Sequence, residues 1–455
     1  MSKKASALVG VDGEEIALTD VDVSASLRDL LAEVSITQHY VNREKKNIEA
    51  VYTFPLPLDA VLLSMQVSIG ERVLKGVVRE KEEAQKGYEK ALDDGNAAVM
   101  LEEIEPGLYT MNVGNLLPGE KVSISLTYSM IYRWSGDQLR FFLPTTISPR
   151  YGNAPHLPHQ NPESSLTVEN KFSLRVEVYG ALKLAQFVCP SHKVSLANNE
   201  GNTVISLNAV KAAMDRDFVL NIKAPNNQRS FAMSGADGTG MAAIASFQPF
   251  FPGLKQPKPL NLAIVVDCSG SMKGDSIDQA KQALGSILEG LQSQDHISIV
   301  AFGNTTNILS KKLLPCTSEN IKKAKLFADE LDANLGGTDI GQALQDTYTL
   351  VSDNESADIL LITDGEVANW TAVVAKAKNT GHRIFTVGVG SAVAEAFVRE
   401  LATKTGGETE LVAPCEGMAE KVVRHFERMR AAKARRATIH WPDGAKSITP
   451  EKLGA

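Results

Sequence analysis

The stretch PLNLAIVVDCSGSM, residues 259–272, decides the fold of the second half of this chain. Its residues from Leu262 to Val266 form an unbroken apolar run, which is typical of a strand buried on both faces of a parallel sheet. The run ends on Asp267, and a short polar loop separates it from a helix pattern that begins near Ser276. We therefore expect the loop at the carboxyl end of a central strand, where open α/β sheets bind ligands.

Three oxygen-bearing side chains, Asp267, Ser269 and Ser271, occupy alternate positions of this loop. One carboxylate and two hydroxyls are hard donors of the kind that Mg²⁺ prefers. The same serines are equally consistent with capping the following helix. The loop alone therefore leaves a metal site and a helix cap as equal alternatives. Cys268, between these residues, is expected to be partly exposed and without a role of its own.

Two further oxygen donors come from later in the same half of the chain. Thr338 lies at a loop-to-helix junction, and Asp364 follows a second buried strand, ILLIT, at residues 359–363. The carboxyl ends of the strands of a parallel sheet meet at one edge, so all these donors can reach one cation. We expect Mg²⁺, or Mn²⁺ or Ca²⁺ in its place, to be held by five residues: Asp267, Ser269, Ser271, Thr338 and Asp364.

The pattern D-x-S-x-S at 267–271, the later threonine and T-D-G at 363–365 resemble the metal-ion-dependent adhesion site of the von Willebrand factor type A family. The resemblance implies that Ser269, Ser271 and Thr338 contact the ion directly, while the two aspartates act through water. It implies an open coordination position, which an Asp or Glu side chain of a protein partner would fill. It also implies that the last helix of the domain, expected at 417–430, responds to the state of the site.

Short runs of alternating apolar and polar residues fill the chain from about residue 16 to residue 132 and predict a β-sandwich. A single helix pattern, at 80–92, interrupts them. Glu49 lies within an apolar strand and needs a partner, for which Arg79 and Lys81 are the candidates.

Four blocks of this region resemble the vault protein inter-alpha-trypsin domain. They are ITQHYVN (36–42), IEAVYTFPLP (48–57), the helix segment 80–91 and GNLLPGE (114–120). This domain followed by a type A domain is the layout of the inter-alpha-trypsin inhibitor heavy chains and of their intracellular and bacterial relatives.

The expected fold class is therefore a multidomain α+β chain, in which a β-sandwich with further strands precedes a doubly wound parallel α/β sheet. We expect the vault-type β domain at 15–133, an additional β unit and loop at 134–250, a proline-rich linker at 251–259, the type A domain at 260–430, and the start of a further β segment at 431–455, as in a fragment of a longer protein.

Composition excludes several classes of function. The 455 residues carry a net charge of −7, which gives no general attraction to nucleic acid or anionic membranes. The four cysteines contain no C-x-x-C pair, so neither a zinc ribbon nor a redox motif is supported. We find no apolar run of membrane-spanning length and no signal-peptide pattern, and we expect a cytoplasmic protein. The basic run at 424–436 is expected to be a solvated helix face.

These features favour a non-enzymatic, metal-dependent adhesion or assembly protein that captures an acidic residue of a protein partner. One alternative is a scaffold in which the metal site is engaged within the molecule. A metal-dependent hydrolase is disfavoured, because His296 and His382 are expected at the amino ends of strands, away from the site, and no other base lies near the motifs. The oligomeric state is left open.

Overall fold

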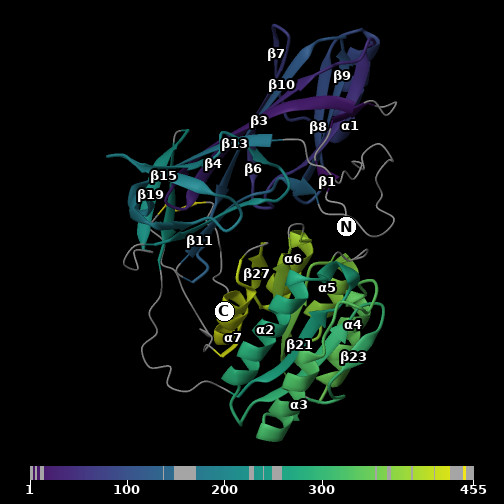
Figure 1. The fold of residues 1–455 in the computed structure, drawn as a ribbon. Helices are drawn as coiled ribbons and strands as arrows, with labels where there is room; N and C mark the ends of the chain where they lie inside the picture. Colours follow the sequence, from purple (N-terminus) through teal and green to yellow (C-terminus); the bar gives the residue numbers. More distant parts are fainter. Residues whose placement is uncertain are drawn as a thin grey trace. The chain divides into compact units, whose positions relative to one another are not determined.

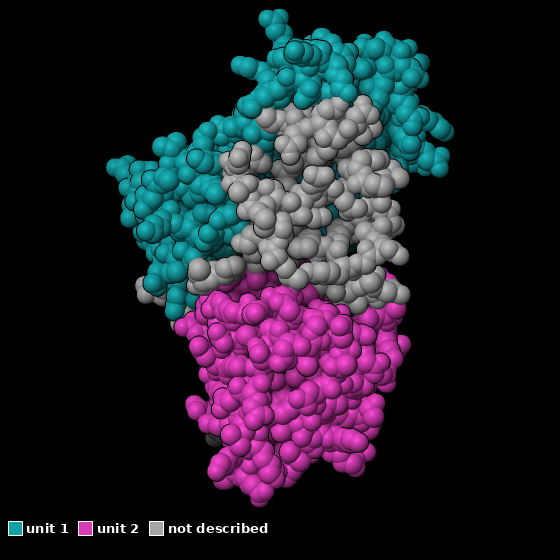
Figure 2. All heavy atoms as spheres, turned by 45° about the vertical axis from the view of Figure 1, so that its right-hand side comes forward, with its two compact units in different colours: residues 1–149, 154–250 teal, residues 150–153, 251–455 magenta. Residues whose placement is uncertain are grey.

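The computed structural model describes residues 4–5, 8–10, 15–136, 138–147, 171–224, 230–238, 240–247, 259–353, 356–365, 370–390, 393–413, 416–430 and 444–446. The chain divides into two compact units, which Figure 2 colours separately. Unit 1 comprises residues 1–149 and 154–250, and unit 2 comprises 150–153 and 251–455. Most of the expected linker and of the segment 431–455 lie outside the described residues, and the finer domain bounds stay predictions. Within the described residues, no helix combines the length and apolar character needed to cross a membrane.

Unit 1 consists almost wholly of strands (Figure 1). In chain order its elements are β1 (Lys4–Ala5), β2 (Leu8–Gly10), β3 (Glu15–Arg28), β4 (Leu31–Val41), β5 (Ile48–Pro55), β6 (Val61–Ile69), β7 (Arg72–Lys75), α1 (Lys81–Asp93), β8 (Ala98–Glu105), β9 (Leu108–Leu116), β10 (Lys121–Ile131), β11 (Gln138–Leu143), β12 (Thr146–Ile147), β13 (Lys171–Tyr179), the 3-10 helix η2 (Gly180–Leu184), β14 (Gln186–Val188), β15 (Val194–Asn198), β16 (Thr203–Leu207), β17 (Ala212–Ala213), β18 (Phe218–Lys223), β19 (Phe231–Asp237) and β20 (Gly240–Ser246).

The long strand β3 organises unit 1. The main sheet has the order β7-β6-β10-β4-β3-β2-β5-β9-β8, and β13 runs parallel to β3 and carries β16, β15 and β17. A separate sheet, β11-β18-β14, contributes to the same hydrophobic cluster as the main sheet. The strand-rich first half that the alternating sequence predicts is thereby confirmed.

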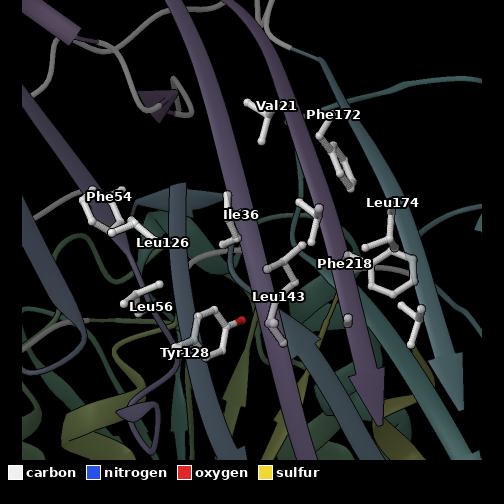
Figure 3. Close-up of a cluster of buried hydrophobic side chains, with 14 of the residues drawn as sticks. Val21, Ile36, Phe54, Leu56, Leu126, Tyr128, Leu143, Phe172, Leu174 and Phe218 are labelled. Carbon is white, nitrogen blue, oxygen red and sulfur yellow. The ribbon is translucent and has the colours of Figure 1, made fainter. Parts of the chain in front are cut away.

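The core of unit 1 follows from that alternation. Along β4 every second side chain is buried, and its intervening Ser35 and Thr37 instead bond across to hydroxyls of β10. Figure 3 shows Ile36, Phe172 and Phe218 among the buried side chains of this cluster. Each fully buried side chain of this kind stabilises the fold by about 1.5–3 kcal/mol.

Glu49 has a different partner from the two that its sequence context suggested. The hydroxyl of Tyr88, the one buried residue of α1, donates a hydrogen bond of 2.9 Å to Glu49 Oε1. Arg79 and Lys81 pair with other glutamates. A phenol can satisfy a half-buried carboxylate without bringing a second charge out of water, which explains why a cation is not required here.

Unit 2 alternates strands and helices. Its elements are β21 (Asn261–Asp267), the 3-10 helix η4 (Gly270–Met272), α2 (Asp275–Gly290), β22 (His296–Phe302), β23 (Thr306–Ile308), β24 (Leu314–Pro315), α3 (Ser318–Asp329), α4 (Ile340–Leu350), β25 (Asp358–Thr363), α5 (Trp370–Lys378), β26 (Arg383–Val389), α6 (Glu395–Thr405), β27 (Thr409–Val412) and α7 (Met418–Arg430). The sheet order is β23-β22-β21-β25-β26-β27, with parallel pairing from β22 to β27. Both the parallel sheet and its helices agree with the predicted fold class.

The strand β21 is buried on both faces, as its apolar run predicts. Leu262, Ile264 and Val266 join a cluster with α2, α3 and α7, whereas Ala263 and Val265 join a second cluster with α4, α5 and α6. The chain moves outward in opposite directions on the two sides of β21, since β22 and β25 are its two neighbours. The crevice at the carboxyl ends of β21 and β25 is therefore the topological switch point of the sheet.

The prediction of a solvated basic face is wrong for the described part of the run at 424–436. Arg424 and Arg428 lie 3.2 Å and 2.9 Å from the carboxylate of Glu410, a buried residue of β27 at one end of unit 2's sheet. Arg430 pairs with Asp295, whose side chain is fully buried. Buried carboxylates need a counter-charge, so these arginines fasten α7 to the rest of the unit.

We expect Arg430→Met to lower the free energy of unfolding of unit 2 by about 3 kcal/mol, because it leaves Asp295 buried without its cation. Lys325→Met is the matched control, since Lys325 pairs with Glu289 at the surface and should cost less than about 1 kcal/mol. Hydrogen exchange of unit 2, recorded at increasing urea concentrations, measures the change in the free energy of unfolding for both substitutions. Equal effects of the two substitutions would contradict the assignment.

Candidate metal centre

The side chain of Asp267 is fixed at the end of β21. It is fully buried, and its Oδ1 accepts a 2.9 Å hydrogen bond from the backbone N–H of Ser269. Its Oδ2 accepts a 2.6 Å bond from the Thr363 hydroxyl, which in turn accepts from the N–H of Gly365. The last residue of β25 therefore orients the last residue of β21. Sequence reasoning missed Thr363 as part of the site, although it directly precedes Asp364.

The two serines of the loop face the site and do not cap the next helix. Their hydroxyl oxygens lie 3.0 Å apart, and Ser271 Oγ donates a 2.8 Å bond to Asp364 Oδ1. The helix α2 begins after Gly274 and has no side-chain cap. The helix-cap alternative for Ser269 and Ser271 is therefore not what the structure adopts.

Thr338 reaches the same place from the loop before α4. A Cβ added to Gly365 would lie 3.3 Å from Thr338 Oγ1 and 3.4 Å from Asp267 Oδ2, so both oxygens border the space beside this glycine. The loop is attached to the serine loop by a 2.9 Å bond from Gly270 N to Gly336 O. The structure thus brings together the five side chains that the sequence singled out. Their role as metal ligands stays a prediction.

Asn304, in the turn after β22, is a supporting residue that the sequence did not reveal. An ideal Cβ at Gly336 or Gly337 would lie 2.6 Å from the Asn304 amide group, so a larger residue at either position would have to displace this amide. The backbone N–H of Asn304 also bonds to Leu335 O at 2.8 Å. The pair of glycines before Thr338 was the only signal of this packing.

The electrostatics of the site favour a cation. Burial raises the pKa of Asp267, and burial together with the charge of Asp267 raises the pKa of Asp364 to about 6. Within the described residues, neither carboxylate forms an ion pair with Lys, Arg or His. A divalent ion would compensate both the lost hydration and the mutual repulsion.

The donor set fits a hard ion. The described residues contain no group of three or more His, Cys, Asp or Glu side chains that could hold a metal. Two carboxylates and three hydroxyls instead provide oxygen donors alone, the ligand type that Mg²⁺, Mn²⁺ and Ca²⁺ prefer.

Other polar residues near the motifs have structural roles. Asp339 Oδ1 accepts from Gln342 N at 2.9 Å and caps α4, as predicted. His296 is the first residue of β22, and His382 directly precedes β26, so both lie at the amino edge of the sheet. His425 is buried on α7 and bonds to Thr386 O. Among the described residues of unit 2, no histidine interacts with the site.

Cys268 is not partly exposed, contrary to its sequence prediction. Only 1% of its surface is exposed, because it packs into the same cluster as Met272 on the α2 side of the sheet. Burial raises the pKa of its thiol to about 12. The thiol is therefore part of the hydrophobic core. Its neighbours Asp267 and Ser269 face the site instead, because successive residues of the loop alternate in direction.

Comparisons with known proteins agree with this arrangement. The vault protein inter-alpha-trypsin domain model matches residues 18–128, and the von Willebrand factor type A domain model matches residues 260–411. The chain is 27% identical to von Willebrand factor A domain-containing protein 5A of Rattus norvegicus, over 91% of this chain and 55% of that protein. It is also 27% identical to a von Willebrand factor A domain-containing protein of Dictyostelium discoideum, over 91% of this chain and 44% of that protein. The chain therefore spans about half the length of these relatives.

Among solved structures, a von Willebrand factor type A protein from Catenulispora acidiphila is similar over 45% of this chain and 46% of that one, with 21% identity and a TM-score of 0.34.

In the folded protein we expect Cys268 to react with iodoacetamide at pH 8 at least about a hundredfold more slowly than the half-buried Cys189, because the thiolate is the reactive form. Mass spectrometry of each cysteine peptide measures the rates. In urea the two rates should become similar. Equal rates in the folded state would show that Cys268 is accessible.

Proposed function

Because the chain carries a vault protein inter-alpha-trypsin domain followed by a von Willebrand factor type A domain, we propose that it is a metal-dependent binding protein. In this proposal the type A domain captures an Asp or Glu side chain of a protein partner through Mg²⁺, or Mn²⁺ or Ca²⁺. The ion is held by five residues: Asp267, Ser269, Ser271, Thr338 and Asp364.

One observation carries this proposal. Oxygen donors from three separate loops converge at the switch point of the sheet, and the two carboxylates among them have no cationic partner in the described residues. Elsewhere in unit 2, buried carboxylates do have one, as Asp358 has Arg383 at 2.6 Å. The missing charge is therefore specific to this site and supports a bound cation.

The different burial of the five donors supports the approach of a partner's carboxylate to the ion from one side only. Asp267 and Ser269 are buried, whereas Ser271, Thr338 and Asp364 are half-buried and border solvent. When bound, a divalent ion with few direct carboxylates supplies residual positive charge, which attracts an external carboxylate. The residues of this chain orient the donors through the bonds of Thr363 and Ser271.

A binding role is also supported over hydrolysis. Activating water for hydrolysis needs a base within hydrogen-bond reach. The histidines of the described part of unit 2 lie at the amino edge of the sheet or on α7. Engagement of the site by an acidic residue of the same chain is the remaining alternative, and the capture experiment below distinguishes it.

We expect Asp267→Ala to abolish Mg²⁺ and Mn²⁺ binding, measured by isothermal titration calorimetry, and to abolish the capture of protein partners that EDTA releases from the wild type. Asp339→Ser is the matched control, since serine retains the helix cap next to Thr338 and should leave both unchanged. Unchanged binding of metal and partner by Asp267→Ala would refute the proposal. Metal binding by the wild type without any EDTA-sensitive capture would favour engagement within the molecule.

Gly365→Ala tests the geometry without removing a donor. Its methyl group would stand 2.7 Å from Thr338 Cγ2 and must displace this side chain, so we expect metal affinity to fall by roughly tenfold or more. Gly285→Ala in α2 is the control, because a Cβ there meets nothing within 4 Å. The same titration compares them. If Gly365→Ala binds metal as the wild type does, Thr338 is not a ligand.

A further inference from the structure

The strand β15 (Val194–Asn198) is an outer strand of unit 1 with unusual exposure. Within the described residues it pairs with β16 alone, and four of its five residues are exposed, including Leu196 at 51%. It contains no charged residue and no proline. Such an edge presents free main-chain groups that can template pairing with another strand.

The two end strands of the main sheet differ from β15 in this respect. At one end, β7 carries Arg72 and Lys75. At the other end, β8 carries Glu102 and Glu103. Charges of one sign on an edge strand oppose its pairing with a copy of itself. The edge of β15 has no such protection.

The hydrogen bonds at the ends of the β15–β16 ladder establish which groups face outward. Asn199 N bonds to Asn202 O at 2.8 Å, and Asn208 N bonds to Lys193 O at 3.0 Å. Antiparallel ladders alternate residue by residue, so the odd-numbered residues of β15 bond to β16. The even-numbered residues direct their N–H and C=O groups away from β16, namely Val194, Leu196 and Asn198.

We propose that β15 is a self-association surface, on which β15 of a second copy of this chain pairs antiparallel about a two-fold axis at Leu196. This register places Leu196 opposite Leu196 of the second copy and Val194 opposite its Asn198. All three outward-facing residues of each strand then lie in hydrogen-bonded pairs, which gives about six main-chain bonds across the axis.

The absence of charges along β15 favours a second copy of this strand over a charged strand as the occupant. In this register Lys193 falls opposite Asn199 of the second copy, so no like charges meet. Two copies of β7 would instead bring Arg72 and Lys75 of both chains together along one short edge. A strongly charged foreign strand would find no opposite charge along β15. The uncharged sequence therefore matches itself, in keeping with the isologous contacts of two-fold dimers.

The pairing surface is small, and its size sets the expected strength. A five-residue strand buries less than the roughly 1,200 Å² of a standard interface. We expect a dimer with a dissociation constant in the range of about 1–100 μM, independent of divalent metal.

Sedimentation velocity of the full chain from about 1 to 200 μM, in EDTA, tests the proposal. The wild type should change from monomer to dimer with concentration. Leu196→Pro removes the outward N–H and costs β15 no bond to β16, so it should weaken dimerisation by roughly tenfold or more. Val210→Ser, at an 88% exposed valine outside the strand, should dimerise as the wild type does.

A charge exchange at the axis makes the test independent of proline. Leu196→Lys and Leu196→Glu should each be monomeric, because like charges meet at the two-fold axis, and an equimolar mixture should recover the dimer. Circular dichroism confirms that both are folded. A wild type that stays monomeric at 200 μM, assembles beyond a dimer, or dimerises equally well with Leu196→Lys overturns the proposal.

Discussion

Two carboxylates that end adjacent parallel strands impose the main constraint on unit 2. Asp267 is the last residue of β21 and Asp364 directly follows β25, so the parallel pairing of these two strands places both carboxylates at the same edge of the sheet. Burial, and after it the charge of Asp267, raises the pKa of Asp364 to about 6. The surrounding loops place hydroxyl groups beside these carboxylates. Ser271 donates a hydrogen bond to Asp364, and Thr338 lies beside Gly365 near Asp267.

The same unit handles its other buried carboxylates differently. Asp295, Asp358 and Glu410 lie away from the candidate site, and each has an arginine within 3.2 Å or less. Most of these arginines come from α7, the last helix, which is thereby fastened to the sheet. The described part of unit 2 therefore contains buried acids that are paired with a cation of the same chain, and one pair of carboxylates, Asp267 and Asp364, that has no such partner.

Sequence patterns predicted the parts of this structure that depend on periodicity. The unbroken run of β21 and the alternation of β4 follow from burial on two faces or one. The common edge of a parallel sheet predicts that Thr338 and Asp364 lie in the same region. Pairings between distant residues were not predictable in this way. Nothing in the local sequence selects Tyr88 for Glu49 or Arg430 for Asp295, because long side chains can reach many neighbours.

The edge strands of unit 1 were not predictable for the same reason: the periodicity of a strand is visible in its sequence, but its pairing partners are not. A strand's own sequence does not reveal whether it lies inside a sheet or at its edge, and β15 reads as an ordinary short strand. Its position becomes informative only when β16 is found on one side and its outward amides on the other. The uncharged β15 differs in this respect from the two ends of the main sheet, which carry arginine, lysine and glutamate, and an exposed uncharged edge is where pairing with another strand is expected.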